Sequence, residues 1–335
     1  RTLSQLVEKY PVLHQVGTND PEISGLCYDS RRCEPGNIFF ALPGIHTDGN
    51  EYVPNAIDGG AVAVVSNALP EPPERDPAVV YLQVPDARQA MSNLSSRFYG
   101  HPSRHIPVIG VTGTDGKSSV VYFIDQLLGQ LGEESGFIST PLIKRDLQLE
   151  KNPFRQSTPE APEIHHALRE MIENGKQYAI LEATSHGLSE KTSRLKDIRF
   201  HVAVFTNLSH EHLEFHGSME QYRSDKANLF RNLDRTSGQR RDDDVPVFGV
   251  VNADDPNAYY ITHATRRPVF SYSVGNSDAT MFASDVRANI QGTSCLIHWR
   301  REARRVHIPL PGAFNVENAM AALLTVATLL DRNPL

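Results

Sequence analysis

The chain has 335 residues, of which 39% are apolar and 22% are charged, proportions that fit a folded globular protein and exclude a disordered or fibrous chain. At roughly 150 residues per domain, this length predicts about two domains. The 33 basic and 40 acidic residues give a net charge of −7, which excludes a global positive field for nucleic acid or an anionic membrane. We therefore expect no nucleic-acid or membrane partner, and a local site for any anionic ligand.

The cysteines and the longest apolar run indicate in which cellular compartment the protein is expected. The three cysteines, Cys27, Cys33 and Cys295, are odd in number and form no CxxC pair, which argues against a disulfide framework or structural zinc and favours a reducing cytosol. The apolar run 319–330 has about 12 residues, short of the roughly 20 that span a bilayer, so we predict a buried helix. No signal-peptide pattern is visible, and the first residue, Arg1, indicates a trimmed or fragmentary sequence.

Short apolar runs at 37–42, 61–66 and 78–84 alternate with turn residues, and a polar stretch at 86–99 has the pattern of a helix. These features predict a small α/β domain. A glycine and a proline within 100–103 then interrupt the pattern, so we place a domain boundary near this point.

From residue 104 onward, apolar runs of four to six residues alternate with helical patterns; they lie at 107–111, 178–181, 202–206, 247–251 and 269–272. Strands buried on both faces that alternate with helices are typical of a doubly wound, mostly parallel sheet. We therefore predict a small N-terminal α/β domain over residues 1–103 and a doubly wound α/β domain over 104–335. The polar stretch 234–244 breaks the pattern and is predicted to be a solvated loop.

A glycine-rich segment, IGVTGTDGKSS at 109–119, lies between a predicted strand and a predicted helix at 120–131. In a phosphate-binding loop, backbone N–H groups point at phosphate oxygens, a lysine reaches the outer phosphates and a hydroxyl binds Mg²⁺. The strict GxxxxGK[ST] pattern is not met, because Val111 stands where the first glycine belongs. The context still predicts phosphate binding, with a glycine-rich turn and an incidental lysine as the alternative.

Three later polar clusters supply candidates for the rest of the chemistry. Residues 182–187 and 206–212 each follow a predicted strand, at the strand end where open α/β sheets bind ligands. The third cluster, 222–226, lies on a predicted helix. The spacing of His210 and His212 is compatible with zinc, and a magnesium site with one nitrogen ligand is the alternative.

Six segments carry a resemblance to a known family: VIGVTGTDGKSS, QSTPEAP, LEATSHGL, VFTNLSHEHLEFHGSMEQYRSDKANLF, VVNADDP and PGAFNVENAMAA. Together they resemble the Mur ligases of peptidoglycan synthesis, and most closely those that add the third peptide residue. The segment YDSRRCEPGNIFFALPGIHTDGNEYVPNAIDGGAVAVV is similar to the uridine-binding domain of that family. The resemblance covers essentially the whole chain.

The resemblance implies ATP and two Mg²⁺ ions as cofactors. Lys117 would hold the β- and γ-phosphates, Ser118 and Glu182 would bind one ion, and His212 would bind the second. Lys226 matches the lysine that the family carbamylates, and CO₂ addition turns an ammonium, which the ions would repel, into an oxygen ligand for a hard cation. The alternative for Lys226 is a plain surface lysine.

The resemblance also implies contacts with the nucleotide and with the acceptor. The nucleotide positions are Gly113, Thr114, Asp115, Gly116, Lys117, Ser118, Ser119, Asn252, Asp255 and Asn315. Asp115 replaces the family's asparagine and brings a carboxylate near the phosphates. A turn and helix-cap role is the alternative for Asn252, Asp255 and Asn315.

Further positions would bind UDP-N-acetylmuramoyl-dipeptide. The uracil end would contact Ser30, His46 and Thr47; the muramoyl-dipeptide would contact Ser157, Thr158, Thr184, Ser185 and Arg194. The stretch before Arg194 is longer than in the family, and Thr192 takes a place usually held by glutamine.

The implied function is an ATP-dependent amide ligase. The γ-phosphoryl group would pass to the D-glutamyl carboxylate, and the amine of a free amino acid would attack the acyl phosphate. Lysine, diaminopimelate and ornithine are all open as that amino acid. We expect a cytoplasmic monomer whose third, amino-acid-binding domain lies beyond residue 335, so the isolated chain should be inactive.

Two other functions compete with this one. A folylpolyglutamate synthetase resembles these ligases in its central domain, but the uridine-type first domain and the STPE and SHGL segments argue against it. A non-catalytic protein that keeps both domains and binds a nucleotide is the second alternative. Binding of UDP or of a folate would distinguish the Mur-type ligase from the folylpolyglutamate synthetase.

Overall fold

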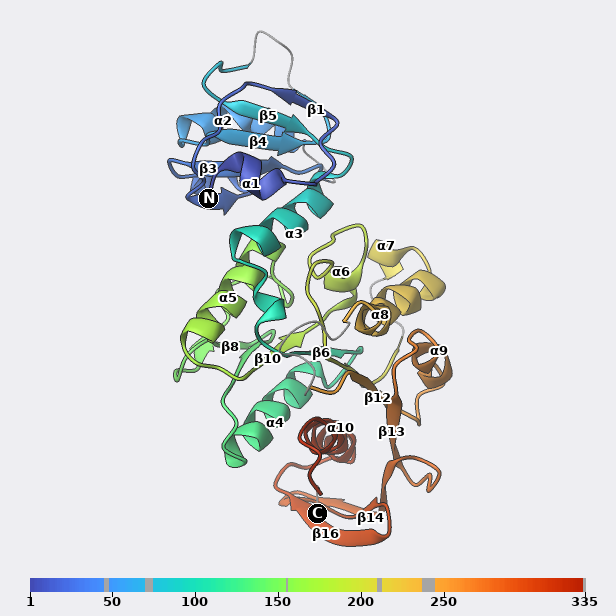
Figure 1. Ribbon diagram of the computed structural model, residues 1–335. Coiled ribbons are helices and arrows are strands. Elements are labelled where there is room, and N and C mark those ends of the chain that lie inside the picture. The colour runs from blue at the N-terminus through green and yellow to red at the C-terminus, as the bar shows by residue number, and fades with distance from the viewer. Residues whose placement is uncertain (45–47, 70–74, 155, 210–212, 237–244, 334–335) are drawn as a thin grey trace. The chain divides into compact units, whose positions relative to one another are not determined.

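The computed structural model describes residues 1–44, 48–69, 75–154, 156–209, 213–236 and 245–333 (Figure 1). Internal contacts divide the chain into two compact units. Unit 1 comprises Arg1–Pro102, Glu160–His166 and Lys191–Asp197, and unit 2 comprises Ser103–Pro159, Ala167–Glu190 and Ile198–Leu335. The two later segments of unit 1 lie outside the residues 1–103 predicted for the first domain.

Unit 1 contains a sheet with the strand order β1-β5-β4-β3-β2. Its strands are β1 (His14–Val16), β2 (Gly25–Cys27), β3 (Asn37–Ala41), β4 (Ala63–Ser66) and β5 (Val80–Gln83). Strands β2 to β5 pair in parallel, and β1 joins β5 antiparallel. All residues of β3 and β4 are buried, so their continuous apolar sequences reflect cover on both faces. The three strands predicted in this region are confirmed.

Helices pack on both faces of this sheet. They are α1 (Leu3–Val7), α2 (Val53–Asp58) and α3 (Ala87–Phe98), with 3₁₀ turns η1 (Ser30–Arg32) and η2 (Gly49–Tyr52). A further turn, η4 (Pro102–Arg104), spans the change from unit 1 to unit 2 along the chain. Because successive strand residues point to opposite faces, Phe40 packs in one apolar cluster with α1 and α3, and Phe39 packs in another with α2. Asp86 accepts hydrogen bonds from two backbone N–H groups of α3, which fixes where the predicted helix begins.

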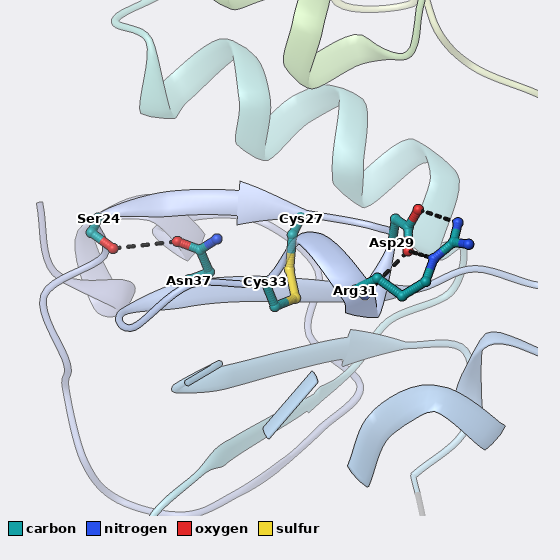
Figure 2. Close-up of a disulfide and its surroundings, with 6 residues drawn as sticks. All are labelled: Ser24, Cys27, Asp29, Arg31, Cys33 and Asn37. Carbon is teal, nitrogen blue, oxygen red and sulfur yellow. Dashed lines mark hydrogen bonds and ion pairs between the residues drawn. A yellow bond between two sulfur atoms is a disulfide. The ribbon is translucent and has the colours of Figure 1, made fainter. Parts of the chain in front are cut away.

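A disulfide joins Cys27 at the end of β2 to Cys33 just after η1 (Figure 2). The prediction against a disulfide was therefore wrong. Asp29 accepts hydrogen bonds from the backbone and side chain of Arg31, and this turn brings the two cysteine Cα atoms to 5.6 Å, within disulfide range. The number and spacing of the cysteines in the sequence do not predict that turn. Cys295 is buried and outside any disulfide.

Unit 2 is built on a sheet that has 11 strands within the described ranges, in the order β16-β15-β14-β13-β12-β11-β6-β10-β7-β8-β9. The strands are β6 (Val108–Thr112), β7 (Ser135–Ile138), β8 (Leu142–Lys144), β9 (Glu150–Lys151), β10 (Tyr178–Glu182), β11 (Val202–Phe205), β12 (Phe248–Asn252), β13 (Val269–Val274), β14 (Met281–Asn289), β15 (Gly292–Trp299) and β16 (Glu302–Ile308). In the order of the sheet, the seven neighbouring strands β14, β13, β12, β11, β6, β10 and β7 are parallel. This confirms the doubly wound prediction. Antiparallel strands extend both edges.

The helices of the second half are α4 (Lys117–Gln130), α5 (Ala161–Glu173), α6 (Ser185–Leu188), α7 (Leu213–His216), α8 (Met219–Leu233), α9 (Ala258–Thr262) and α10 (Phe314–Leu329). Helices α4 and α10 share an apolar core with the sheet (Figure 1). Side chains of α8 lie so close to β6 that a Cβ on Gly110 would be 2.5 Å from Leu229 Cδ1. The buried helix predicted at 319–330 is part of α10.

No helix in the described part of the chain is both long enough and apolar enough to span a bilayer. The loop predicted at 234–244 lies mostly outside the described residues.

Candidate nucleotide and acceptor site

The glycine-rich segment forms the turn between β6 and α4. Gly113 and Gly116 have φ of +151° and +81°, and a Cβ there would lie 1.8 Å from Thr206 Oγ1 and 2.2 Å from Asn318 Oδ1. Both positions therefore require glycine. Lys117 is the first residue of the 14-residue helix α4, so the turn places an N-terminal array of N–H groups where an anion is favoured.

The end of β11 holds this turn in place. Thr206 Oγ1 donates to the carbonyl oxygen of Asp115 at 2.7 Å, and the backbone N–H of Asp115 donates to Asn207 Oδ1 at 2.8 Å. Ser209 N donates to Thr114 Oγ1 at 2.9 Å. The Asp115 side chain is exposed, so this residue serves the loop through its backbone. Thr206 and Asn207 belong to the candidate cluster 206–212 predicted from the sequence, which assigned neither of them a specific role.

A hydroxyl and a carboxylate meet beside the loop. Ser118 Oγ donates to Glu182 Oε2 at 2.8 Å, and Glu182 also accepts from Thr140 N and Thr140 Oγ1, both at 2.8 Å. Glu182 ends β10, the neighbour of β6 in the sheet, and is 3% exposed. Lys117 Nζ donates to the Thr114 carbonyl oxygen at 2.7 Å. Thr140 is not among the site residues predicted from the sequence.

The side-chain oxygen atoms of Ser118 and Glu182 are suitable ligands for a hard cation. Hydroxyl and carboxylate oxygens are ligands that Mg²⁺ prefers, so the Ser118–Glu182 pair fits the first ion that the resemblance implies. Across the described ranges, no cluster of three or more His, Cys, Asp or Glu residues could hold a metal. His212, the candidate ligand of the second ion, lies outside those ranges.

Lys226 lies on α8 and is 2% exposed. Its Nζ donates to the carbonyl oxygen of Gly113 and lies 4.6 Å from the ring centre of Tyr222. The alternative of a plain surface lysine is wrong, because the amine is buried against the phosphate loop. The carbamate on this lysine stays a prediction.

Several predicted acceptor contacts gather beyond β10. Thr158 Oγ1 donates to the Glu182 carbonyl oxygen at 2.8 Å and lies 2.9 Å from Thr184 Oγ1. Thr184 accepts from Gly187 N and so caps α6. Ser185 begins α6 and is 2% exposed. Ser157, next to Thr158, is partly buried. The structure thus brings these hydroxyls to the same strand end as Glu182.

Other predicted acceptor contacts lie in unit 1. Ser30 begins η1 and is mostly buried. Arg194 is buried and pairs with Glu160, with 2.9 Å from Nε to Oε1. His46 and Thr47 lie outside the described residues. The roles of these residues in binding stay predictions.

A pocket in unit 1 adjoins η1. Its lining includes Asp29, Arg32, Tyr99 and Glu163, together with Tyr28, whose hydroxyl donates to Glu163 Oε1. Burial raises the pKa of the Glu163 carboxyl. Burial first, and then the hydrogen bond to Glu163, raise the pKa of the Tyr28 hydroxyl. The Tyr28–Glu163 hydrogen bond therefore lies in the wall of this pocket.

Each of the three adenine-side candidates makes a side-chain hydrogen bond within unit 2. Asn252 Nδ2 donates to Glu317 Oε2 at 3.1 Å. Asp255 Oδ2 accepts from Leu208 N at 2.7 Å, and Asn315 Nδ2 donates to the Pro311 carbonyl oxygen at 2.9 Å. Asn252 Oδ1 and Asp255 Oδ1 also accept from Asp254 N and Asn257 N, as the turn alternative predicts. No side-chain hydrogen bond within the described part of the chain caps the start of α10, and contact with a nucleotide stays a prediction.

Comparisons with known proteins match most of the chain. The family described as "Mur ligase middle domain" matches residues 111–326, and that described as "Mur ligase family, catalytic domain" matches residues 22–99. UDP-N-acetylmuramyl-tripeptide synthetase of Borreliella afzelii (strain PKo) is 44% identical over 318 residues, which are 94% of this chain and 61% of that protein.

Two further relatives are similar over nearly the whole chain. UDP-N-acetylmuramoyl-L-alanyl-D-glutamate–2,6-diaminopimelate ligase of Caldanaerobacter subterraneus subsp. tengcongensis is 34% identical over 95% of this chain and 62% of its own. A solved structure of a ligase with that name has a TM-score of 0.76 and 26% identity, covering 93% of this chain and 61% of its own. The chain therefore spans about 61% of the length of relatives that it matches.

Proposed function

Because this chain belongs to the Mur ligase family, we propose that it forms the first two domains of an ATP-dependent amide ligase of peptidoglycan precursor synthesis. The acceptor is UDP-N-acetylmuramoyl-L-alanyl-D-glutamate, and the product carries a third amino acid. The observation that carries the proposal is the convergence of Ser118, Glu182 and Lys226 on the phosphate loop.

The proposed reaction has two steps. The D-glutamyl carboxylate attacks the γ-phosphorus of ATP, which releases ADP and forms an acyl phosphate. The amine of the amino acid then attacks the acyl carbon, and phosphate leaves as the amide forms. Phosphoryl transfer depends on positioning and charge neutralisation more than on covalent help from the protein.

The chain's own groups fit these needs. The N–H groups of the turn and the Lys117 ammonium neutralise phosphate charge, while Thr206 and Asn207 keep the turn in its binding conformation. Ser118 and Glu182 would hold one Mg²⁺, and carbamylated Lys226 with His212 would hold the second. Bound Mg²⁺ neutralises charge on the transferred phosphoryl group.

The proposed contacts with the acceptor follow the family resemblance. We assign its uracil end to Ser30, His46 and Thr47, and its muramoyl-dipeptide to Ser157, Thr158, Thr184, Ser185 and Arg194. The hydroxyl cluster around Thr158 and Ser185 supports the second assignment, because it lies at the strand end that also holds Glu182. Asn252, Asp255 and Asn315 would contact the adenine side of ATP. The residues from Gly113 to Ser119 would contact its phosphates.

The cellular setting belongs to the same proposal. A monomer in the cytoplasm would meet ATP and the free amino acid there. Reductants in that compartment keep thiols reduced, so Cys27 and Cys33 would be found there as two thiols rather than as the disulfide.

A phosphate-release assay on the full-length protein tests the function. We expect release that requires ATP, the UDP-muramoyl-dipeptide and an amino acid together, with lysine, diaminopimelate and ornithine compared in parallel. Lys117→Ala should lower kcat by roughly 10²–10³-fold, as loss of a charge-stabilising donor does; Lys151→Ala, an exposed lysine on β9, is the control. ATP hydrolysis that ignores the acceptor, or a requirement for a folate, would refute the assignment.

A further inference from the structure

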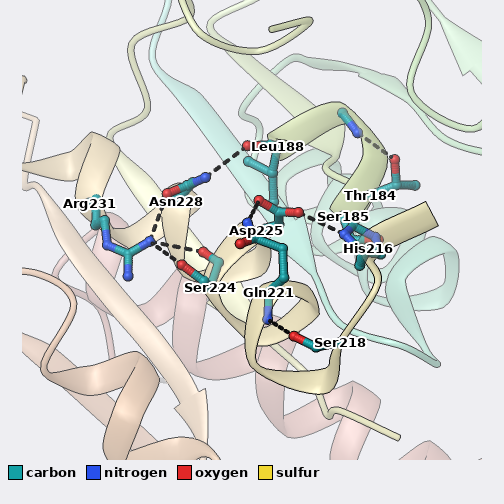
Figure 3. A network of polar contacts seen from close by, with 11 residues as sticks. Thr184, Ser185, Leu188, His216, Ser218, Gln221, Ser224, Asp225, Asn228 and Arg231 are labelled. Carbon is teal, nitrogen blue, oxygen red and sulfur yellow. Dashed lines mark hydrogen bonds and ion pairs between the residues drawn. The ribbon is translucent and has the colours of Figure 1, made fainter. Parts of the chain in front are cut away.

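Three side chains from three helices form a buried hydrogen-bonded chain (Figure 3). Asp225 Oδ2 of α8 lies 2.7 Å from His216 Nδ1 at the end of α7, and His216 Nε2 lies 3.0 Å from Ser185 Oγ at the start of α6. All three residues are at most 4% exposed. We call them the Asp225–His216–Ser185 chain.

The chain has a defined direction. A carboxylate only accepts hydrogen bonds, so Asp225 Oδ2 accepts a hydrogen bond from the N–H group at His216 Nδ1. The other ring nitrogen of a neutral imidazole is then an acceptor, and the Ser185 hydroxyl donates its proton to it. Among the described residues no group donates a hydrogen bond to Ser185 Oγ, so its lone pairs can accept one from another molecule.

Both ends of the chain are anchored. Gln221 Nε2 donates to Asp225 Oδ1 at 2.9 Å, and Asn228 Nδ2 donates to the Leu188 carbonyl oxygen at 3.0 Å. Asp225 and Asn228 are three residues apart and therefore share a face of α8. A Cβ on Gly187 would lie 2.5 Å from Thr158 Cγ2, so α6 is packed closely against the acceptor-contact hydroxyls.

Helix α8 serves two parts of the site with consecutive residues. Asp225 reaches Ser185 through His216, whereas Lys226 reaches the Gly113 carbonyl oxygen in the phosphate loop. One rigid helix thus fixes the hydroxyl of the acceptor side relative to the loop. Positioning of reacting groups contributes strongly to rate, so such a link has a kinetic consequence.

From this geometry we propose that His216 and Asp225 are positioning residues for the ligase reaction. They hold the Ser185 hydroxyl as a hydrogen-bond acceptor for an amide N–H of the muramoyl-dipeptide. The proposal rests on the proposed function, because it takes Ser185 as an acceptor contact. Neither His216 nor Asp225 touches the substrate in this arrangement.

The same three residue types form the triad of serine hydrolases, which is the competing use of this geometry. Both uses require a substrate to reach Ser185 Oγ, so they differ only in whether the serine becomes covalently modified. The proposed ligase reaction needs no serine nucleophile, and membership of the Mur ligase family therefore favours the positioning role. Labelling of Ser185 by a fluorophosphonate would overturn the proposal.

Two substitutions at one position test the chain in the full-length enzyme. His216→Gln can offer an acceptor where Nε2 stood, whereas His216→Asn reaches only the Nδ1 position and leaves Ser185 without its acceptor. We expect His216→Asn to raise KM for the UDP-muramoyl-dipeptide about tenfold, the loss of one hydrogen bond, with KM for ATP unchanged. His216→Gln should recover most of that loss.

A double variant and a control complete the kinetic test. Ser185→Ala added to His216→Asn should raise KM no further, because both remove one shared interaction. His298→Asn, which removes a similar histidine–serine contact to Ser284 on the antiparallel edge, should leave KM unchanged. Additive effects at 185 and 216, or equal effects on both substrates, would refute the positioning role.

A spectroscopic measurement separates this proposal from the proposed function. In the ¹⁵N spectrum of the substrate-free enzyme, His216 should show a protonated Nδ1 and an unprotonated Nε2, and Ser185→Ala should shift the Nε2 signal. The reverse tautomer or an unresponsive signal would refute the chain even if the ligase activity is found. A wild-type enzyme that shows this signature but does not use the muramoyl-dipeptide would refute the proposed function, and with it the role of Ser185.

Discussion

Lys226 carries its amine to a buried position against the Gly113 carbonyl oxygen. If CO₂ converts this amine into an oxygen ligand, Lys226→Ala should lower kcat of the full-length enzyme by roughly 10²-fold or more, the effect of losing charge stabilisation. Added formate or acetate should restore part of the activity, because a free carboxylate supplies the missing oxygen donors. Steady-state rates with and without the carboxylate check this outcome.

Two further variants sharpen that experiment. Lys226→Arg keeps a positive charge but cannot form the carbamate. This variant should therefore be inactive, and added formate or acetate should not restore its activity. Lys144→Ala removes a lysine that pairs with Asp125 at 2.8 Å, and carboxylates should not stimulate it. An active Lys226→Arg enzyme would contradict the carbamate.

Single residues also show how far a sequence can locate this site. Ser118 and Glu182 could be predicted because one follows the phosphate loop after β6 and the other ends β10, and adjacent parallel strands bring such residues together. His216 was visible only as one of several histidines, and its partners are 31 and 9 residues away. Helix packing, rather than spacing, creates that contact.

The same distinction applies to the elements. The parallel strands of unit 2 could be predicted because they are continuous buried apolar runs, as in β11 and β12. Strand β14 mixes buried, partly buried and exposed residues, so its sequence lacks that signal. The segments Glu160–His166 and Lys191–Asp197 belong to unit 1 through long-range contacts, which no local pattern records.

The turn η1, with its flanking cysteines, is an element whose stability can be measured. Cross-linking Cys27 to Cys33 closes a short loop, and the chain-entropy relation gives about 2 kcal/mol for it. We expect oxidised protein to have a free energy of unfolding higher by about this amount than protein kept in reductant. Urea unfolding under both conditions measures the difference.

Variants assign that effect to the cross-link. Cys27→Ser/Cys33→Ser should unfold equally with and without reductant, whereas Cys295→Ser, outside any disulfide, should keep the response. Equal stability of oxidised and reduced wild-type protein would show that the cross-link contributes nothing.

At the scale of the whole molecule, the net charge of the protein has the same sign as the charge of its proposed substrates. The chain carries a net charge of −7, and the proposed substrates are polyanions. Long-range attraction therefore cannot concentrate them at the site. The binding energy must come from short-range groups, namely the N–H array at α4 and the Lys117 ammonium. Affinity should accordingly depend on an intact glycine-rich turn.

Stability of the whole molecule should depend on pH through His165 of α5. Its ring is 0% exposed, and within the described ranges neither ring nitrogen has a hydrogen-bond partner. Burial, with a smaller contribution from His101, lowers the pKa of His165 to about 3. Unfolded chains bind this proton near pH 6.5, so between the two values they hold more protons than the folded chain and folding weakens as pH falls.

His165→Phe removes this sensitivity. Between pH 6.5 and 5, wild type should lose about 2 kcal/mol more of its free energy of unfolding than the variant; urea unfolding across this range measures it. The Glu163 carboxyl, whose pKa burial raises, contributes in the opposite sense, since a raised folded pKa favours folding at low pH. It is present in both proteins and cancels in the comparison. His14→Gln, at an exposed histidine, should behave as wild type, and parallel pH profiles for wild type and His165→Phe would show that the buried imidazole is not the cause.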